Sequence, residues 1–215
     1  MEFLDQKVSL LPRRNTFLDV GAGNGKLTAH FTNTFLSSIA IEPNRSLVPE
    51  LRTRCPSAKI IESPLEEAAI GCQADFILCS HVFYYLPKDS WLRSLETMAN
   101  YLGPDGLLAA ALQNPETDCM KMLRHFIGGR FDLTGLGREF SSRHPSFRTS
   151  VMTVPAMIRT SSLEDACTIA EFMLNLVPMP EPPRYVEVES YVRANFGRAG
   201  VFHFSCDQDF LLIQA

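Results

Sequence analysis

The chain has 215 residues, of which 46% are hydrophobic and 20% are charged, and its formal net charge is −4 at pH 7. This length and apolar content predict one folded domain with a large core and exclude a disordered chain. The acidic balance lacks the basic surface that nucleic-acid binding requires, and no apolar run approaches the ~18 residues of a membrane span.

The first half of the chain alternates short apolar runs with segments of helical spacing. The apolar runs end at turn residues and predict buried strands at residues 16–20, 38–41, 58–61, 74–79 and 107–112. Helices are expected at residues 26–35, in a stretch up to about residue 54 that Pro49 interrupts, at 64–69 and at 88–102. A turn at residues 103–106 should end the last of these helices. Strands joined by helices in this way predict a parallel sheet covered on both faces.

The second half of the chain is less regular. Helices are expected at residues 119–126, 163–176 and 185–196, a strand at 147–160, and one or two strands at 201–214. The proline-rich segment 178–184 is followed by only about 30 residues, which are too few for a second domain. We therefore interpret it as a surface loop within a single domain of residues 1–215.

Six cysteines and five histidines are dispersed along the chain. They have no zinc-site spacing, and several cysteines lie inside apolar runs, where Cys acts as a small hydrophobic residue. We expect reduced thiols in a cytoplasmic protein and no metal site. The first residues include two early acids and no long apolar run, so no signal peptide is expected.

The segment FLDVGAGNGKLT, residues 17–28, carries the strongest functional signal: a buried strand containing Asp19, three alternating glycines and then a helix. Such glycines permit a tight turn and let a ligand approach the backbone closely. A nicotinamide-dependent oxidoreductase would carry G-x-G-x-x-G, whereas this loop is G-x-G-x-G, and the Asp19 carboxylate would repel a pyrophosphate. The carboxylate can instead serve an ammonium or amide donor. A glycine-rich turn without a ligand is the alternative.

This pattern resembles the first motif of class I S-adenosylmethionine-dependent methyltransferases. The next strand ends at Glu42, about 20 residues after the glycines, where an acid can accept hydrogen bonds from two ribose hydroxyls, as it also does in NAD sites. After the third strand, the resemblance implies a residue that contacts the adenine, and we choose Ser63 over Glu62. Ser63, Pro64 and Glu66 also match a helix N-terminus with a capping box, and the two interpretations are compatible.

The fourth strand leads into CSHVFYYLP, residues 79–87. Ligands of open α/β sheets bind outside the carboxyl ends of the strands, so Ser80 and His81 should lie where the cofactor sulfur and the acceptor meet. Tyr84 and Tyr85 offer aromatic faces for a sulfonium or an amine. We expect at least one of these rings to pack under the following helix instead. His81 either contacts the acceptor or is a structural group.

Most of the chain is similar to histamine N-methyltransferase-like enzymes. The matching segments are FLDVGAGNGKLT, IEPN, SHVFYYLP, YLGPDGLLAAAL, CMKMLRHFIGGRF and FHFSCDQDFLLIQA. The resemblance implies a Rossmann-like class I methyltransferase fold, with a mainly parallel seven-stranded sheet, helices on both faces and an antiparallel C-terminal strand. It also implies that S-adenosyl-L-methionine is held by Asp19, Gly21, Ala22, Gly23, Glu42, Pro43, Ser63 and Ser80. The implied acceptor contacts are His81, Tyr84, Tyr85, Met120, Arg124 and Cys206.

The chain also departs from that family. Only residues 1–14 precede the first strand, so the helical segment that covers the family's pocket and supplies an acid is nearly missing. The family's glutamine and tryptophans are also absent, so histamine itself is not the expected acceptor. A homodimer mate or a partner chain would then complete the pocket. On the acceptor side, residues 113–150 form an insertion, whose basic residues are Arg124, His125, Arg130, Arg138, Arg143, His144 and Arg148. They form either a solvated loop or a site for an acidic group of the acceptor.

The expected activity is methyl transfer to a small-molecule acceptor, at a nitrogen of an amine or amino-acid-like metabolite. A small-molecule O-methyltransferase and a non-catalytic cofactor-binding module are the alternatives. If the acceptor is protonated, a base is needed, and His81 is our candidate because an unperturbed histidine pKa of about 6.5 suits proton removal.

Overall fold

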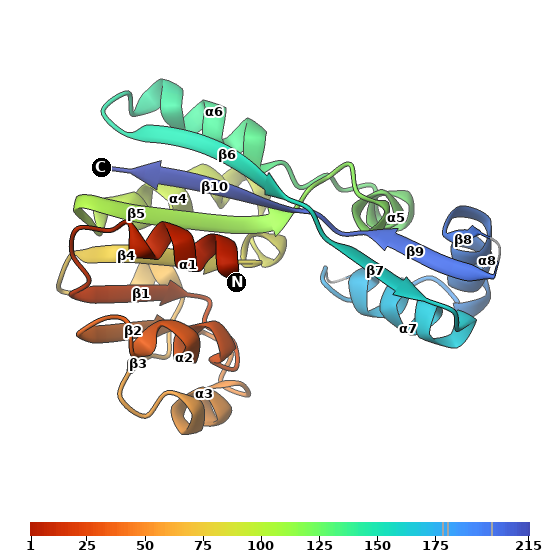
Figure 1. Ribbon diagram of the computed structural model, residues 1–215, viewed down its shortest axis with the longest axis horizontal. Helices are drawn as coiled ribbons and strands as arrows, with labels where there is room; N and C mark the ends of the chain where they lie inside the picture. Colours follow the sequence, from red (N-terminus) through yellow and green to blue (C-terminus); the bar gives the residue numbers. More distant parts are fainter. Residues whose placement is uncertain (178, 180, 199) are drawn as a thin grey trace.

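The computed structural model describes residues 1–177, 179, 181–198 and 200–215 and contains two β-sheets (Figure 1). The strands of the larger sheet are β1 (Thr16–Val20), β2 (Ser37–Ile41), β3 (Lys59–Ile61), β4 (Ala74–Ser80), β5 (Leu102–Gln113), β6 (Arg148–Val154) and β10 (Gln208–Gln214). Their order is β3-β2-β1-β4-β5-β10-β6. Strand β10 is antiparallel to both of its neighbours, and the remaining pairs are parallel. The predicted fold class is confirmed.

Helices cover both faces of this sheet. The first face carries α1 (Glu2–Ser9), α2 (Lys26–Thr32) and α3 (Val48–Arg54). There Leu4 and Phe31 pack with Phe17 and Phe76, whose rings stack at 5.4 Å. The second face carries the 3-10 helices η1 (Leu65–Glu67), η2 (Phe83–Tyr85) and η3 (Lys88–Ser90), followed by α4 (Trp91–Asn100) and α6 (Leu133–Arg143). Alternate residues of each strand face opposite sides of the sheet. Because successive residues of the central strands are apolar, both faces of the sheet are apolar.

A smaller antiparallel sheet lies beyond the carboxyl ends of the parallel strands (Figure 1). It has the order β7-β9-β8, with β7 (Met157–Thr160), β8 (Gly197–Arg198) and β9 (Val201–Ser205). The helices α5 (Asp118–Ile127), α7 (Leu163–Leu174) and α8 (Tyr185–Asn195) accompany it. Side chains of this region and of the larger sheet share one buried cluster, which joins Leu112 to Met120, Met173 and Phe204.

Several predicted element boundaries are wrong. The expected strand 147–160 is two strands in different sheets, because Pro155 lies between them and has no N–H to continue a ladder. The expected turn at 103–106 is a bulge inside β5, where Asp105 has a φ of 58° and the register with β4 shifts. The expected helix 64–69 is a single 3-10 turn. Helices α1 and α6 were not predicted. The proline-rich segment includes residues 178 and 180, which lie outside the described residues.

Within the described part of the chain, no helix combines the length and apolar character needed to cross a bilayer. The same residues contain no cluster of three or more His, Cys, Asp or Glu side chains placed to hold a metal ion. All six cysteines are free, and five of them are buried.

Candidate active site

The glycine loop joins β1 to α2 and folds over the end of β2. The N–H groups of Gly21 and Ala22 both donate to the Ile41 carbonyl, at 2.9 and 3.0 Å. Gly21 and Gly23 have φ angles of 72° and 58°, in the left-handed region that glycine adopts freely. A Cβ on Gly21 would lie 2.3 Å from the Val82 side chain, whereas one on Gly23 would have no described atom within 4 Å. The backbone at Gly23 is therefore open to a ligand.

Replacing Gly21 with alanine should lower the free energy of unfolding by about 2 to 5 kcal/mol, since both the backbone conformation and the contact with Val82 are violated. Gly23→Ala is the matched control and should cost only about 1 to 2 kcal/mol, because its strain is conformational alone. Chemical denaturation measures both values. Combining Gly21→Ala with Val82→Ala should destabilise by less than the sum of the single variants; strict additivity would contradict the packing argument.

Glu42 ties the end of β2 to the glycine loop. Its carboxylate is buried, and Oε2 accepts from the N–H of Gly23 at 2.7 Å while Oε1 accepts from the N–H of Asn44 at 2.8 Å. A carboxylate has about four lone-pair positions, so this one can accept further hydrogen bonds. The Glu42 carboxylate is therefore a hydrogen-bond acceptor that is held in place next to the open backbone at Gly23.

Asp19 lies behind the loop, with only 2% of its surface exposed. Its Oδ2 accepts from the Thr28 hydroxyl at 2.7 Å. Burial raises the pKa of Asp19 to about 7; the Thr28 hydrogen bond opposes this shift and the charge of Glu42 adds to it. The carboxyl therefore titrates near neutral pH, where a cation brought close to it would favour the ionised form.

The free energy of unfolding should fall as the pH rises from about 4 to about 7, because folded Asp19 keeps its proton up to about pH 7 and unfolded Asp19 loses it near its ordinary pKa of 3.8. The fall is on the order of 4 kcal/mol and should be absent in Asp19→Asn. Denaturant unfolding of both proteins at about pH 4 and about pH 8 measures the difference. Equal pH dependence of the two proteins would show that Asp19 does not titrate as described.

A small apolar hollow of about 80 Å³ lies between the ends of β1, β2 and β4, and Gly21, Pro43, Leu65 and Val82 contribute to its lining. Ser63 precedes this region and is half-buried, with its hydroxyl 3.2 Å from the Pro64 carbonyl oxygen. The predicted capping box is not formed, since the 3-10 turn begins after Pro64 and has no side-chain cap.

The end of β4 brings Ser80 and His81 next to the glycine loop, because β1 and β4 are neighbouring parallel strands. The N–H of His81 donates to the Ala111 carbonyl at 2.8 Å, and the residue has a φ of 61°. Its ring stacks on Tyr84 with 5.8 Å between centroids. Burial lowers the pKa of His81 below its usual 6.5, so the imidazole is neutral at neutral pH.

The two predicted tyrosines have different environments. Tyr84 is buried, its ring meets Phe131 edge-on at 5.0 Å, and its hydroxyl accepts from the N–H of Gln113 at 2.8 Å. Tyr85 is 61% exposed. One ring therefore packs in the core, as the alternative interpretation expected, and the other is available at the surface.

The remaining predicted acceptor contacts are only partly brought together. Met120 is buried on α5, and its sulfur lies 4.0 Å from the Tyr84 hydroxyl. Arg124, one turn later on α5, is exposed. Cys206 is buried between β9 and β10, where its N–H donates to the Ala156 carbonyl at 2.9 Å and burial raises its pKa.

Residues 2–166 match the family model of a methyltransferase domain. The chain belongs to this methyltransferase family. With the seven-stranded fold described above, this match confirms the prediction of an enzyme of the class I, S-adenosylmethionine-dependent type.

Individual relatives are distant. A protein of Alkaliphilus oremlandii (strain OhILAs), named an uncharacterized methyltransferase, is 23% identical over 94 residues. That alignment spans 44% of either chain, so less than half of the relative's length is covered. Among solved structures, YcgJ from Bacillus subtilis has a TM-score of 0.72 at 13% identity, covering 99% of this chain and 97% of that one. The plantazolicin methyltransferase BpumL in complex with SAH has a TM-score of 0.60 at 11% identity, covering 99% and 81%. At these identities the shared property is the fold.

Two polar side chains of the methyltransferase were missed by the sequence analysis. Gln113 is the last residue of β5 and Gln208 the first of β10, and both lie at the carboxyl end of the parallel strands. The available signal was a polar residue closing the long apolar run LLAAALQ, residues 107–113.

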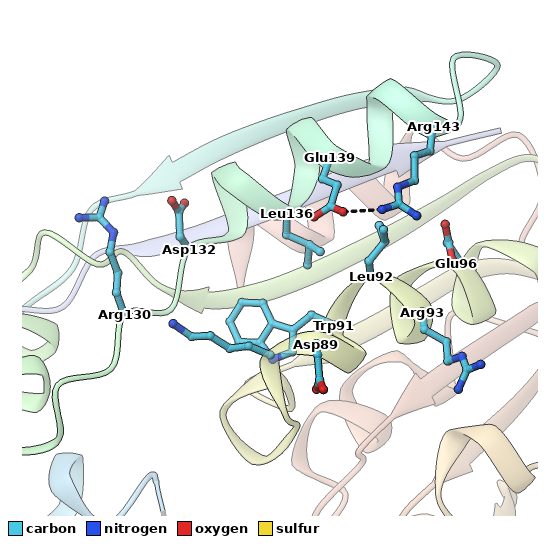
Figure 2. A pocket seen from close by; sticks show the side chains of 11 residues that line it. Asp89, Trp91, Leu92, Arg93, Glu96, Arg130, Asp132, Leu136, Glu139 and Arg143 are labelled. Atoms are coloured by element: carbon cyan, nitrogen blue, oxygen red, sulfur yellow. Dashed lines mark hydrogen bonds and ion pairs between the residues drawn. The ribbon is translucent and has the colours of Figure 1, made fainter.

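The basic residues of the methyltransferase's 113–150 segment lie largely on the helices α5 and α6 and not in a loop, but all of them except His144 are exposed, as the solvated interpretation expected. Three are ion-paired at 2.8 Å: Arg130 with Glu116, Arg143 with Glu139 and His144 with Glu96. A pocket of about 430 Å³ lies between α4 and α6. Both acidic and basic side chains line it (Figure 2). This balance of charge does not single out an anionic ligand.

Proposed function

We propose that this methyltransferase transfers a methyl group from S-adenosyl-L-methionine to a nitrogen of a small amine or amino-acid-like acceptor. The observation that carries the proposal is a neutral, largely buried imidazole, His81, at the end of the strand next to the glycine loop. A protonated amine must lose a proton before its lone pair can attack, and a neutral histidine can accept that proton. A base at this position therefore suits a protonated acceptor nitrogen. A hydroxyl acceptor also loses a proton, and the assay below separates the two.

The chemistry of the glycine-loop region fits the cofactor. Glu42 has free lone pairs for the ribose hydroxyls, and Gly23 leaves backbone open beside it. The apolar hollow beside Pro43 suits the adenine ring. We assign the cofactor to Asp19, Gly21, Ala22, Gly23, Glu42, Pro43, Ser63 and Ser80. When bound, S-adenosylmethionine supplies a methyl group activated by its sulfonium sulfur.

On the acceptor side, we assign His81 as the proton-accepting base. Tyr84 acts through its buried ring, which supports the imidazole of His81. We also assign acceptor contacts to Tyr85, Met120, Arg124 and Cys206. Residues 1–215 would act as one domain with 113–150 on the acceptor side, and the motif SHVFYYLP supports membership of the histamine N-methyltransferase-like subgroup.

A methyl-transfer assay tests the proposal. Radiolabelled S-adenosylmethionine is offered with phenethylamine, cadaverine or phenylalanine, and with phenethyl alcohol as the hydroxyl counterpart. We expect N-methylated products from at least one amine and none from the alcohol. Methylation of the alcohol alone would favour the O-methyltransferase alternative. Cofactor binding without transfer to any amine would contradict the proposal.

A further inference from the structure

Two glutamines face each other at the carboxyl end of β5. The antiparallel ladder pairs Gln113 directly with Gln208. Side chains of directly paired residues in an antiparallel sheet lie on the same face, with Cβ atoms about 5 Å apart. The two amide groups are therefore neighbours on one face of the sheet.

In each side-chain amide the nitrogen donates a hydrogen bond, whereas the oxygen accepts none. Gln113 Nε2 donates to the Met173 sulfur at 3.5 Å, and Gln208 Nε2 donates to the Cys206 carbonyl at 2.6 Å. Both Oε1 atoms are buried and have no hydrogen-bond partner among the described residues, and only 8% of Gln113 is exposed. Buried polar atoms are nearly always paired in native proteins, so two adjacent unpaired acceptors require an explanation.

The amide pair lies beside the end of β4. Ser80 is paired with Ala111, and Gln113 is two residues further along the same face of β5, which is about 7 Å. The Gln113 N–H donates to the hydroxyl of Tyr84, the residue that stacks on His81. The backbone carrying the amide is thus fixed to the segment that carries the proposed base.

Further hydrogen bonds fix the strand ends next to the two glutamines. Asn114 Nδ2 donates to both carboxylate oxygens of the buried Asp209, at 3.0 and 3.1 Å, and Thr153 donates to the same group at 2.7 Å. The N–H of Asn114 donates to the Asp207 carbonyl at 2.8 Å. The ends of β5, β6 and β10 are therefore tied together, which is the support that a preorganised binding site needs.

The two unpaired oxygens favour a ligand that donates hydrogen bonds. A carboxylate or phosphate would meet two amide oxygens, neither of which can donate a hydrogen bond to it. An amine presents N–H donors that both oxygens can accept.

We propose that Gln113 and Gln208 orient the acceptor by accepting hydrogen bonds from the N–H groups of a primary or secondary amine. This inference rests on the proposed function, since it concerns the acceptor of the same reaction. The glutamines are positioning residues, and His81 remains the base. Met173 of α7 covers Gln113, and its flexible side chain can turn aside when the amine enters.

The test measures methyl transfer to whichever of phenethylamine, cadaverine and phenylalanine the wild-type enzyme methylates fastest. Gln113→Leu and Gln208→Leu should each raise KM for the amine at least about tenfold, the effect of losing a hydrogen bond to a charged group. Gln113→Glu keeps the acceptor oxygens and adds a negative charge, so its KM should equal or fall below the wild-type value. Gln73→Leu, at an exposed position, is the matched control and should change nothing.

Cofactor affinity and thermal stability complete the test. The Kd for S-adenosylmethionine should be unchanged in all variants, and Gln113→Leu should be at least as stable as the wild type, because it removes an unpaired buried acceptor. A wild-type KM in both leucine variants, or an equally raised KM in Gln113→Glu, would overturn the subsite while leaving the methyltransferase assignment intact. Transfer to no amine by the wild type would overturn the proposed function and the subsite with it.

Discussion

Replacing Glu42 with alanine is expected to weaken S-adenosylmethionine binding about 100-fold or more, because the carboxylate would serve both the ribose hydroxyls and the loop. Its Oε2 holds the N–H of Gly23 at 2.7 Å, so the loop loses its anchor when the side chain is removed. Hydrogen bonds to a charged group contribute about 1.5 to 3 kcal/mol each, and two of them account for the expected loss. Isothermal calorimetry measures it directly.

Glu42→Gln separates the two functions of this residue. The amide oxygen can still accept from Gly23, so the loop should stay in place, while the charge and one acceptor oxygen are lost. We expect an intermediate affinity and a loss of stability of about 1 to 3 kcal/mol, because the amide nitrogen would face the N–H of Asn44 and cannot accept from it. Glu139→Gln breaks an exposed pair with Arg143 and should leave affinity unchanged. Native affinity in Glu42→Ala would mean that the cofactor does not bind at the end of β2.

Replacing His81 with asparagine is expected to lower kcat by about 100-fold or more, the usual contribution of a general base, while cofactor affinity stays within about twofold. Asparagine is the suitable replacement because it tolerates the left-handed backbone at this position, where φ is 61°. In the wild type, kcat/KM should rise with pH as His81 loses its proton, and burial places this rise below 6.5. The variant should lack that rise. Equal losses of kcat and cofactor affinity would show that His81 is a structural or cofactor residue.

The elements nearest the glycine loop could be predicted from sequence because local signals agree there. In β1 an apolar run ends at glycines, and the buried faces of β1, β2 and β4 follow directly from such runs. Their parallel order then fixes that Gly21, Glu42 and Ser80 lie at one edge, since carboxyl ends of parallel strands meet there. For that reason the sequence alone could predict which residues of the proposed cofactor site lie together.

Helix α6 could not be predicted because its sequence opposes its fold locally. Gly135 and Gly137 each disfavour a helix by about 1 kcal/mol relative to alanine. The structure explains Gly137 by packing, since a Cβ there would lie 2.7 Å from the Leu211 side chain of β10. Asp132 caps the helix by accepting from the N–H of Gly135 at 3.0 Å. Tertiary contact, which no local pattern encodes, decides this element.

The environments of the residues proposed for the acceptor side also depend on tertiary contacts. Adjacent tyrosines have the same chemistry in sequence, and only packing separates the buried Tyr84 from the exposed Tyr85. The pairing of Gln113 with Gln208 joins residues far apart in the chain, through a register that follows from where β10 enters the sheet. Pairing between residues so far apart in the chain cannot be predicted from local patterns in a single sequence.

Calorimetric titration of the purified chain with S-adenosylmethionine, S-adenosylhomocysteine and NAD tests the central claim most directly. The glycine loop, the Glu42 acceptor and the position of Asp19 predict micromolar binding of the first two compounds and none of NAD. Binding of NAD alone, or of none of the three, would contradict a functional S-adenosylmethionine site at this edge of the sheet.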